Sequence, residues 1–214
     1  MSTQYRKATS EDRLAIADLH AESWRHTYRG AYRDEFLDGP VFDDRRAVWE
    51  KRLSEPPANQ FVVVAEEEGR IVGLACAYGG DDEQWGTLLD NIHVQPELHG
   101  NGIGTGLVAE VVNWCLAHHP DSGLWLWVVG QNHRARRFYE RLGAIDRGAE
   151  LRPPSAGGGK RRQVHRYAWA TLDSVRLRSA PASTSRREPT PQSALRAGRR
   201  GCSGAKVVGR RDAE

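Results

Sequence analysis

Hydrophobic residues in the first fifty positions follow a helical rhythm in two places. Behind Thr9 and Asp12, a pair that resembles a capping box, apolar residues recur every three or four positions. This stripe consists of Leu14, Ala17, Ala21 and Trp24. A second helix is predicted over about residues 43–53, after a polar stretch that carries several aromatic side chains. Two helices are therefore expected before the first predicted strand.

Runs rich in β-forming residues begin after position 60. The segments FVVVAEE and IVGLACAY, joined by Glu68, Gly69 and Arg70, predict a hairpin with a tight turn. Further strands are predicted over TLLDNIHV (87–94), LWLWVV (124–129) and QVHRYAWATL (163–172). Between them the spacing is helical, first from Ile103 and then after Asn132, which is placed to cap a helix. This order predicts a mixed α/β sheet with crossover connections.

A glycine-rich segment, HGNGIGTG, stands between the predicted strand 87–94 and the helix that follows it. Its glycines are Gly100, Gly102, Gly104 and Gly106. A strand that runs through such a loop into a helix forms an anion site, because free N–H groups and the positive end of the helix dipole converge there. A P-loop would need a lysine that is absent, and a dinucleotide fingerprint would need a third glycine where Thr105 stands. The segment therefore predicts a phosphate-binding loop of a different type.

The composition indicates a soluble protein with a well-formed core. Of the 214 residues 39% are hydrophobic, seven are tryptophan, and 28% are charged. No run approaches the roughly 18 apolar residues of a membrane span, and the first residues lack the apolar stretch of a secretory signal. Cys76, Cys115 and Cys202 are widely separated and form neither a disulfide framework nor a zinc or redox motif. A cytoplasmic location is expected.

Charge and composition divide the chain into a body, residues 4–172, and a basic tail, residues 173–214. The tail holds ten Lys and Arg against four Asp and Glu, and it has no aromatic residue. Such a segment buries too little apolar surface to offset the entropy of ordering, so disorder is expected. Its arginines leave two interpretations open, a solvated extension or an arm that contacts nucleic acid.

Two blocks of the body resemble the Gcn5-related N-acetyltransferases (GNAT). VQPELHGNGIGTGL, residues 94–107, is similar to the pyrophosphate loop of that family, and NHRARRFYERLGA, residues 132–144, is similar to its next signature. One helix and one strand separate the blocks, as in the family, and the resemblance extends over about residues 4–170. Two departures stand out, since His99 replaces the usual Arg or Gln and Ala144 replaces a common aromatic residue.

The resemblance implies an α/β (α+β) fold, with a mixed, mostly antiparallel twisted sheet and helices on both faces. It implies acetyl transfer from acetyl-CoA to an amine in a ternary complex, with no metal. Ile92, His93 and Val94 are expected to line the pantetheine arm, with the Val94 N–H near the thioester oxygen, and Asn132 to reach the pantetheine. The expected pyrophosphate contacts are His99, Gly100, Asn101, Gly102, Ile103, Gly104 and Thr105.

Catalysis needs a proton donor for the departing thiolate and an acceptor for the proton of the amine. Tyr139 matches the usual general acid of the family and is also expected to contact the cofactor. The alternative interpretation is that Tyr139 only packs in the core. Trp127 stands where some protein-acetylating relatives carry a carboxylate, so that base is missing. Asp90 and His93 remain candidates through a water molecule, and Asp90 is equally compatible with a solvated carboxylate at the end of a strand.

The acceptor pocket of the family lies against its first two helices. Here this region offers Trp24, Tyr28 and Tyr32, with Trp85 before the central strand, and these rings suit a planar or cationic amine or simply a core. The acceptor is expected to be a small-molecule or protein amine, with neither membrane nor nucleic acid as the main partner, and the chain a monomer or homodimer. Two alternatives remain: a non-catalytic acyl-CoA-binding protein, and a nucleic-acid-associated protein acting through its tail.

Overall fold

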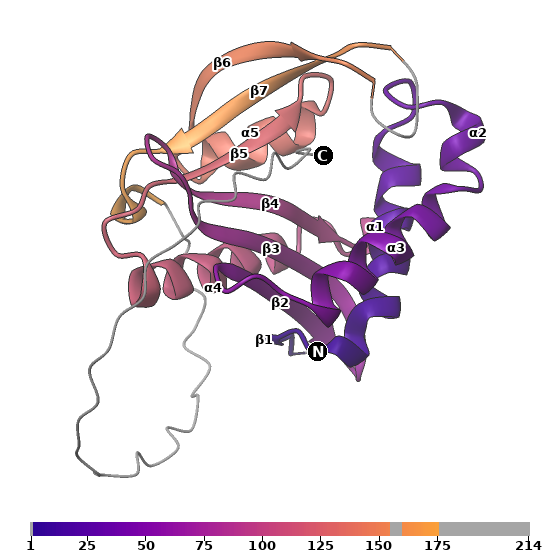
Figure 1. Cartoon of the computed structure of the whole chain (residues 1–214), viewed down its shortest axis with the longest axis horizontal. Coiled ribbons are helices and arrows are strands. Elements are labelled where there is room, and N and C mark those ends of the chain that lie inside the picture. The colour runs from indigo at the N-terminus through magenta and orange to yellow at the C-terminus, as the bar shows by residue number, and fades with distance from the viewer. Residues whose placement is uncertain (1, 155–159, 176–214) are drawn as a thin grey trace, which may run out of the picture. The chain divides into compact units, whose positions relative to one another are not determined.

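The computed structural model describes residues 2–154 and 160–175, coloured in Figure 1. Its helices are α1 (Arg13–Thr27), α2 (Asp34–Leu37), α3 (Val41–Ser54), α4 (Ile103–His118) and α5 (His133–Arg141). Its strands are β1 (Gln4–Lys7), β2 (Gln60–Glu67), β3 (Arg70–Asp82), β4 (Gly86–Val94), β5 (Leu124–Val129), β6 (Ile145–Arg152) and β7 (Arg162–Trp169). None of the helices described is long and apolar enough to cross a bilayer.

The described strands form a seven-stranded sheet in the order β1-β2-β3-β4-β5-β7-β6. Each pair of neighbours is antiparallel except β4 and β5, which run parallel. The predicted hairpin is confirmed, and its turn places Glu68 and Gly69 at positive φ, 51° and 74°. The mixed, mostly antiparallel sheet predicted from the sequence is confirmed as well.

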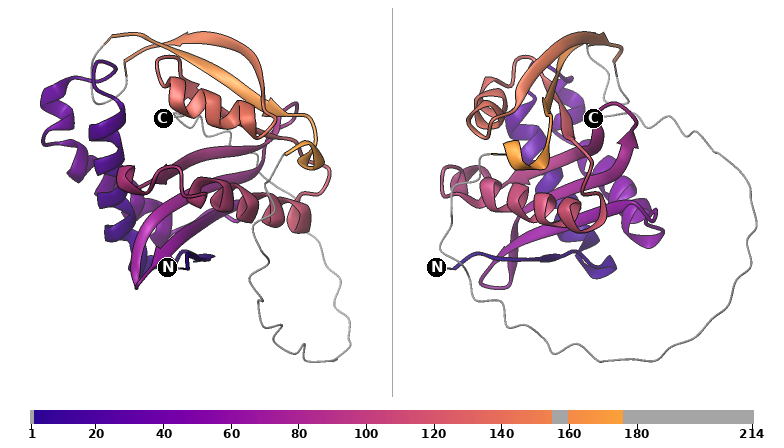
Figure 2. Two further views of the ribbon diagram at one scale, coloured as in Figure 1. Left: turned by 180° about the vertical axis from the view of Figure 1, so that it is seen from behind. Right: turned by 90° about the vertical axis from the view of Figure 1, so that its left-hand side faces the viewer.

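Helices cover both faces of the sheet (Figures 1 and 2). Successive residues of a strand face opposite sides, and β2 shows the two faces clearly. Val62 and Val64 pack in a cluster with Ile16 of α1 and Trp49 of α3, whereas Val63 packs in a second cluster with residues of α4 such as Leu107. The core therefore has two layers, one on each side of the sheet.

Strands β4 and β5 separate after a short paired segment. Their only paired residues are Thr87 with Leu124 and Leu88 with Trp125, at the beginning of both strands. Figure 1 shows the strands diverging from there. Because strand spacing within a sheet is only about 4.8 Å, this divergence opens the sheet at the carboxyl ends of the two strands, next to the glycine-rich loop.

Three elements were not predicted from the sequence, β1, α2 and β6. Strand β6 has no alternating apolar pattern, and nearly all of its side chains are exposed at the edge of the sheet. Leu14, the first residue of the predicted apolar stripe, is 55% exposed. Leu14 lies in the first turn of α1 at the margin of the buried stripe, which is centred on Ile16, Ala17 and His20.

The predicted boundary after residue 172 stays a prediction. Leu172 and Val175 are both buried in the core cluster on the α4 side of the sheet. Most of the basic tail, residues 176–214, lies outside the described residues, and so does the disorder that was expected for it.

Candidate active site

The gap between β4 and β5 leads into a pocket of about 900 Å³. Its wall comes from five places: the carboxyl half of β4, the end of β5, the glycine-rich loop with the start of α4, the helix α5 with the turn before it, and the end of α1. The residues predicted from the sequence that line it are Trp24, Tyr28, Asp90, Ile92, His93, Val94, His99, Gly100, Gly102, Ile103, Gly104, Thr105, Asn132 and Tyr139. Asn101 and Trp85 are not among the lining residues.

The start of α4 presents free backbone amides to this pocket. Gly100 and Gly102 have positive φ, 93° and 87°, a conformation that residues with a side chain rarely adopt. This geometry turns the chain into the helix, whose first backbone bond runs from the Gly106 N–H to the Gly102 carbonyl over 3.0 Å. Among the described residues, the amides from Gly102 to Thr105 have no backbone acceptor. Free amides at the positive end of a helix dipole are suited to bind an anion.

The edge of β4 offers further backbone groups. The Gln95 N–H donates to the Val72 carbonyl over 2.9 Å, and Val94 pairs with Gly73 in the adjacent position of the β3–β4 ladder. Hydrogen-bonded and non-hydrogen-bonded pairs alternate in an antiparallel ladder. Val94 and Ile92 therefore direct their N–H and C=O groups away from β3, toward the gap left by β5.

His99 fastens the glycine-rich loop to this edge. Its Nε2 lies 2.8 Å from the carbonyl oxygen of Val94, and a carbonyl only accepts, so Nε2 carries the proton. Burial and the nearby Arg134 guanidinium lower the pKa of His99, which keeps the ring neutral at pH 7. Its Nδ1 is buried without a partner among the described residues. His99 thus holds the loop in place and leaves the attraction of anions to the amides and to Arg134.

Helix α5 brings Asn132 and Tyr139 to the opposite wall. The Asn132 side chain caps the helix, since its Oδ1 accepts from the Ala135 N–H at 3.1 Å, and Gly143 ends it at a φ of 92°. Tyr139 is only 7% exposed and is part of the core, yet it also lines the pocket. Burial, and secondarily the neighbouring Tyr28, raise the pKa of Tyr139, so its phenol stays protonated at pH 7.

Asp90 sits on a bulge in the middle of β4. Cys76 of β3 pairs with Asn91 and the next residue, Ala77, pairs with Leu89, which leaves Asp90 as the extra residue. Its carboxylate forms an ion pair with Arg52 of α3 at 2.8 Å and accepts from the Asn91 amide. The Asp90 side chain is 5% exposed and lines the pocket.

His93 is held from the side of α1. Its Nδ1 lies 2.8 Å from the Ser23 hydroxyl, and its ring packs at 4.2 Å from that of His20. His20 in turn accepts a hydrogen bond at Nδ1 from the Trp49 indole N–H over 2.9 Å. Burial, together with the Arg45 guanidinium, lowers the pKa of His93 to about 3. His93 is therefore neutral at any pH near 7.

The end of α1 supplies an aromatic wall. Trp24 is 2% exposed, and its ring lies 4.8 Å from that of Tyr32 and 5.4 Å from that of Tyr28. Trp85 lies elsewhere, at the turn before β4, where the guanidinium of Arg166 stacks over it at 4.9 Å. Trp24 and Tyr28 therefore meet the pocket directly, and Trp85 does not.

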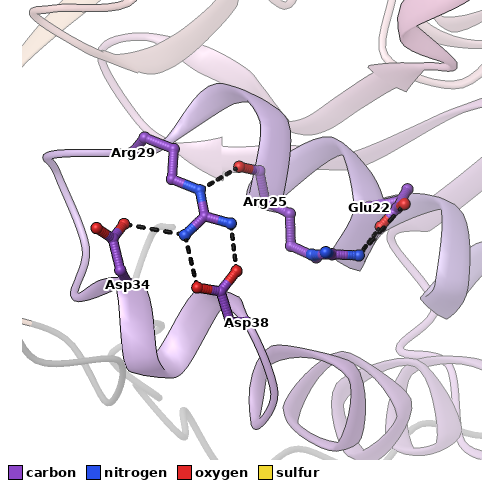
Figure 3. Close-up of polar contacts among 5 residues, drawn as sticks. All are labelled: Glu22, Arg25, Arg29, Asp34 and Asp38. Carbon is purple, nitrogen blue, oxygen red and sulfur yellow. Dashed lines mark hydrogen bonds and ion pairs between the residues drawn. The ribbon is translucent and has the colours of Figure 1, made fainter.

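An ion-pair cluster fixes the segment that carries Tyr28 and Tyr32. Arg29 donates to Asp34 at 3.0 Å, to both carboxylate oxygens of Asp38, and to the Arg25 carbonyl at 3.2 Å (Figure 3). These contacts join the C-terminal end of α1 to α2. The short helix α2, which was not predicted from the sequence, is thus tied to the end of α1 next to the aromatic wall.

Ser23 and Arg134 are among the lining residues that were not predicted. Ser23 and His20 both lie on the buried stripe of α1, where polar side chains need partners, and that position was the available signal. Arg134 lines the pocket beside the loop. No group of three His, Cys, Asp or Glu side chains in residues 2–154 and 160–175 is arranged to hold a metal ion.

Comparison with known proteins shows the family to which the chain is similar. Residues 16–144 match the model of the acetyltransferase (GNAT) family. An uncharacterized N-acetyltransferase of Mycobacterium tuberculosis is 36% identical over 111 residues, which are 50% of this chain and 64% of the relative, so the chain spans less than two thirds of that relative. The 5-NmdU N-acetyltransferase of Pseudomonas phage PaMx11 is 30% identical over 140 residues, 65% of this chain and 89% of the relative.

Solved structures show the same fold. The PaiA N-acetyltransferase of Thermoplasma acidophilum, in complex with coenzyme A, aligns with a TM-score of 0.59 over 79% of this chain and 100% of its own, at 17% identity. At that level of identity the likeness concerns the fold alone.

Proposed function

Because the chain belongs to the acetyltransferase (GNAT) family, we propose that it is an acetyl-CoA-dependent N-acetyltransferase. In this proposal the acetyl group moves to a primary amine by direct attack within a ternary complex. The observation that carries it is the row of free amides at the start of α4, which opens onto the same pocket as Tyr139, Asp90 and His93. The groups proposed for phosphate binding and for acyl transfer thus line one cavity.

The residues present fit acetyl-CoA. The free amides from Gly102 to Thr105 would hold the pyrophosphate, with Arg134 adding positive charge. The outward N–H and C=O groups of Ile92 would pair with the pantetheine amides as a neighbouring strand does, while the Val94 N–H is left for the thioester oxygen because the Val94 carbonyl accepts from His99. Asn132 uses its Oδ1 as a cap, which leaves its amide N–H₂ to donate to the pantetheine. When bound, acetyl-CoA supplies an acyl group activated as a thioester.

The chemical step forms a bond between the amine nitrogen and the acetyl carbon while the carbon–sulfur bond breaks. The Val94 N–H would stabilise the negative charge that develops on the carbonyl oxygen. Tyr139 donates its phenolic proton to the departing sulfur and regains a proton from solvent. The raised pKa of Tyr139 keeps that proton in place until the sulfur carries negative charge.

The amine must also give up a proton, and the site offers two acceptors. His93 is neutral with a pKa lowered to about 3, so its basicity is no greater than that of a carboxylate and it has no charge to attract an ammonium ion. Asp90 lines the pocket on its bulge. We assign the proton acceptor to Asp90, acting through water, and assign to His93 the role of a neutral wall group held by Ser23.

The direct test is turnover with a panel of small-molecule amines and peptide α- and ε-amines. Released thiol and the mass of the acetylated product are both measured. Acetylation of any member, lowered in Tyr139→Phe, supports the proposal. Binding of acetyl-CoA without thiol release above the rate of hydrolysis across the panel would make the chain a non-catalytic acyl-CoA-binding protein.

A further inference from the structure

Arg166 on β7 lies among three tryptophans next to the pocket. It pairs directly across the sheet with Trp127 of β5. Its guanidinium lies 4.4 Å from the centre of the Trp127 ring, 4.9 Å from that of Trp85 and 5.5 Å from that of Trp125. Trp127 itself lines the pocket. Arg166 is thus one side chain away from the cavity in which the amine would react.

A second arginine lies on the same face of the same strand. Arg162 is four residues before Arg166, and alternation along β7 turns both side chains to one side. Its guanidinium lies 4.2 Å from the centre of the Tyr32 ring. Tyr32 contacts Trp24, which lines the pocket. Arg166 therefore lies behind Trp127, and Arg162 lies behind Tyr32. The two arginines stand on opposite sides of the part of the pocket in which the amine would bind.

These two guanidiniums differ from the others that stack on aromatic rings. Arg25, Arg45, Arg52 and Arg152 also lie over aromatic rings, and each forms an ion pair with an acidic side chain. Within the described residues Arg162 and Arg166 have no such acid. The Nε of Arg166 and one Nη of Arg162 are buried without a hydrogen-bond partner among the described residues; the Nε of Arg25 is too, but the Arg25 guanidinium is paired with Glu22.

An aromatic ring attracts a guanidinium but leaves its N–H groups without a full hydrogen-bond acceptor. A buried charged donor without an acceptor is costly, and a planar guanidinium suits the two oxygens of a carboxylate or phosphate. We propose that the acceptor amine carries an oxyanion, a carboxylate or a phosphate, which Arg166 binds beside Trp127, while Arg162 adds positive charge from the side of Tyr32. This inference rests on the proposed acetyl transfer and specifies its substrate class.

The positive charges of Arg162 and Arg166 also disfavour polyamines as acceptors. A polyamine would bring further ammonium groups toward two guanidiniums that lack acidic partners in the described structure, and like charges repel. Trp85 was predicted from the sequence as a substrate contact. In this proposal Trp85 does not touch the substrate but holds the guanidinium of Arg166, which does.

Calorimetric titration of the full chain with matched probes tests the proposal. The pairs are 2′-deoxyuridine 5′-monophosphate against 2′-deoxyuridine, and phenylacetate against phenylacetamide. Both are run with saturating CoA, which occupies the amides of α4, and again on the free chain. The variants are Arg166→Gln, Arg166→Lys and Arg162→Gln. Arg161→Gln is the matched control, because Arg161 is exposed just before β7 and its replacement removes the same charge.

One member of each pair carries the oxyanion, and at least one pair should show a preference of about tenfold or more for it. Arg166→Gln should abolish that preference, Arg166→Lys should restore part of it, and Arg161→Gln should keep it. The pair that shows the preference identifies phosphate or carboxylate. Equal binding within both pairs, or a preference that survives in Arg166→Gln, overturns the inference. A separate titration with CoA shows which hypothesis has failed. If CoA binds but the oxyanion preference is absent, only the inference about the acceptor is wrong; if CoA does not bind, the proposed function is wrong.

Discussion

The hydroxyl of Ser23 and Nδ1 of His93, 2.8 Å apart, tie helix α1 to strand β4 at the wall of the pocket. Ser23 directly precedes Trp24 in the aromatic wall, and His93 lies between Ile92 and Val94, whose backbone groups face the gap in the sheet. One hydrogen bond thus joins the acceptor side of the cavity to the side proposed for pantetheine. His93 is held as a neutral group at this junction, because burial lowers its pKa to about 3.

Replacing Asp90 should affect catalysis more than replacing His93. Loss of a general base typically costs at least about a hundredfold in rate, so we expect kcat/KM for the amine to fall by that factor in Asp90→Asn and only a few-fold in His93→Gln. Steady-state kinetics at saturating acetyl-CoA measures both. Arg52→Gln is the control, since it breaks the ion pair of Asp90 but keeps the carboxylate. Equal losses in Arg52→Gln and Asp90→Asn would give Asp90 a structural role only.

Removal of the Tyr139 hydroxyl should lower kcat by about ten- to a hundredfold and leave the affinity for acetyl-CoA nearly unchanged. The basic limb of the pH–rate profile should lie above the ordinary tyrosine pKa of about 10, because burial raises that of Tyr139. Tyr167→Phe serves as the matched control. The Tyr167 hydroxyl donates to Glu140 at 2.7 Å, but Tyr167 does not line the pocket.

Tyr167→Phe should therefore lower the free energy of unfolding by about 1–3 kcal/mol, since a buried polar network loses a partner, while kcat is kept. If kcat in Tyr139→Phe matched that of the unmodified chain, Tyr139 would be a packing residue and the proton donor would lie elsewhere.

The free energy of unfolding should fall as the pH is lowered from 7 to 5. An unfolded histidine has a pKa of about 6.5, whereas that of folded His93 is lowered to about 3. The unfolded chain then binds more protons below pH 6.5, so acid favours unfolding, by about 1.4 kcal/mol per pH unit for one such histidine. His20, whose pKa burial also lowers, adds to the same trend.

Urea unfolding at pH 7 and pH 5 measures this effect. His93→Gln should lose about 2 kcal/mol less than the unmodified chain over this interval. The exposed His118 provides the control, and His118→Gln should behave like the unmodified chain. A His93→Gln variant with the same pH dependence as the unmodified chain would show that folded His93 titrates normally.

Much of the fold was predictable because its signals are local. The hairpin turn at Glu68 and Gly69, the cap at Asn132 and the buried stripe of α4 all depend on residues close in sequence. Strand β6 was not predictable, because an exposed edge strand needs no apolar alternation and is formed by pairing with β7.

In the site, too, the features set by neighbouring residues were predictable, and those set by residues distant in sequence were not. The glycine-rich loop was predictable from its spacing, and the structure adds that Gly102 has a φ of 87° whereas the backbone of Gly104 is helical. The environment of Asp90 was not predictable, because the bulge and the Arg52 partner depend on strand register and on a helix distant in sequence. Likewise, nothing in the sequence near Trp85 indicated that Arg166 would stack on it.

Titration calorimetry of the chain with acetyl-CoA, repeated on Gly104→Ala and Gly39→Ala, tests the central claim most directly. A Cβ at Gly104 would meet Phe138 at 3.4 Å, an ordinary contact, so the fold should survive while a methyl group enters the phosphate cradle; a Cβ at Gly39 meets open space. We predict that the chain and Gly39→Ala bind acetyl-CoA and that Gly104→Ala binds at least about tenfold more weakly. No binding by the chain, or equal binding by Gly104→Ala, would contradict the assignment of this loop to the cofactor.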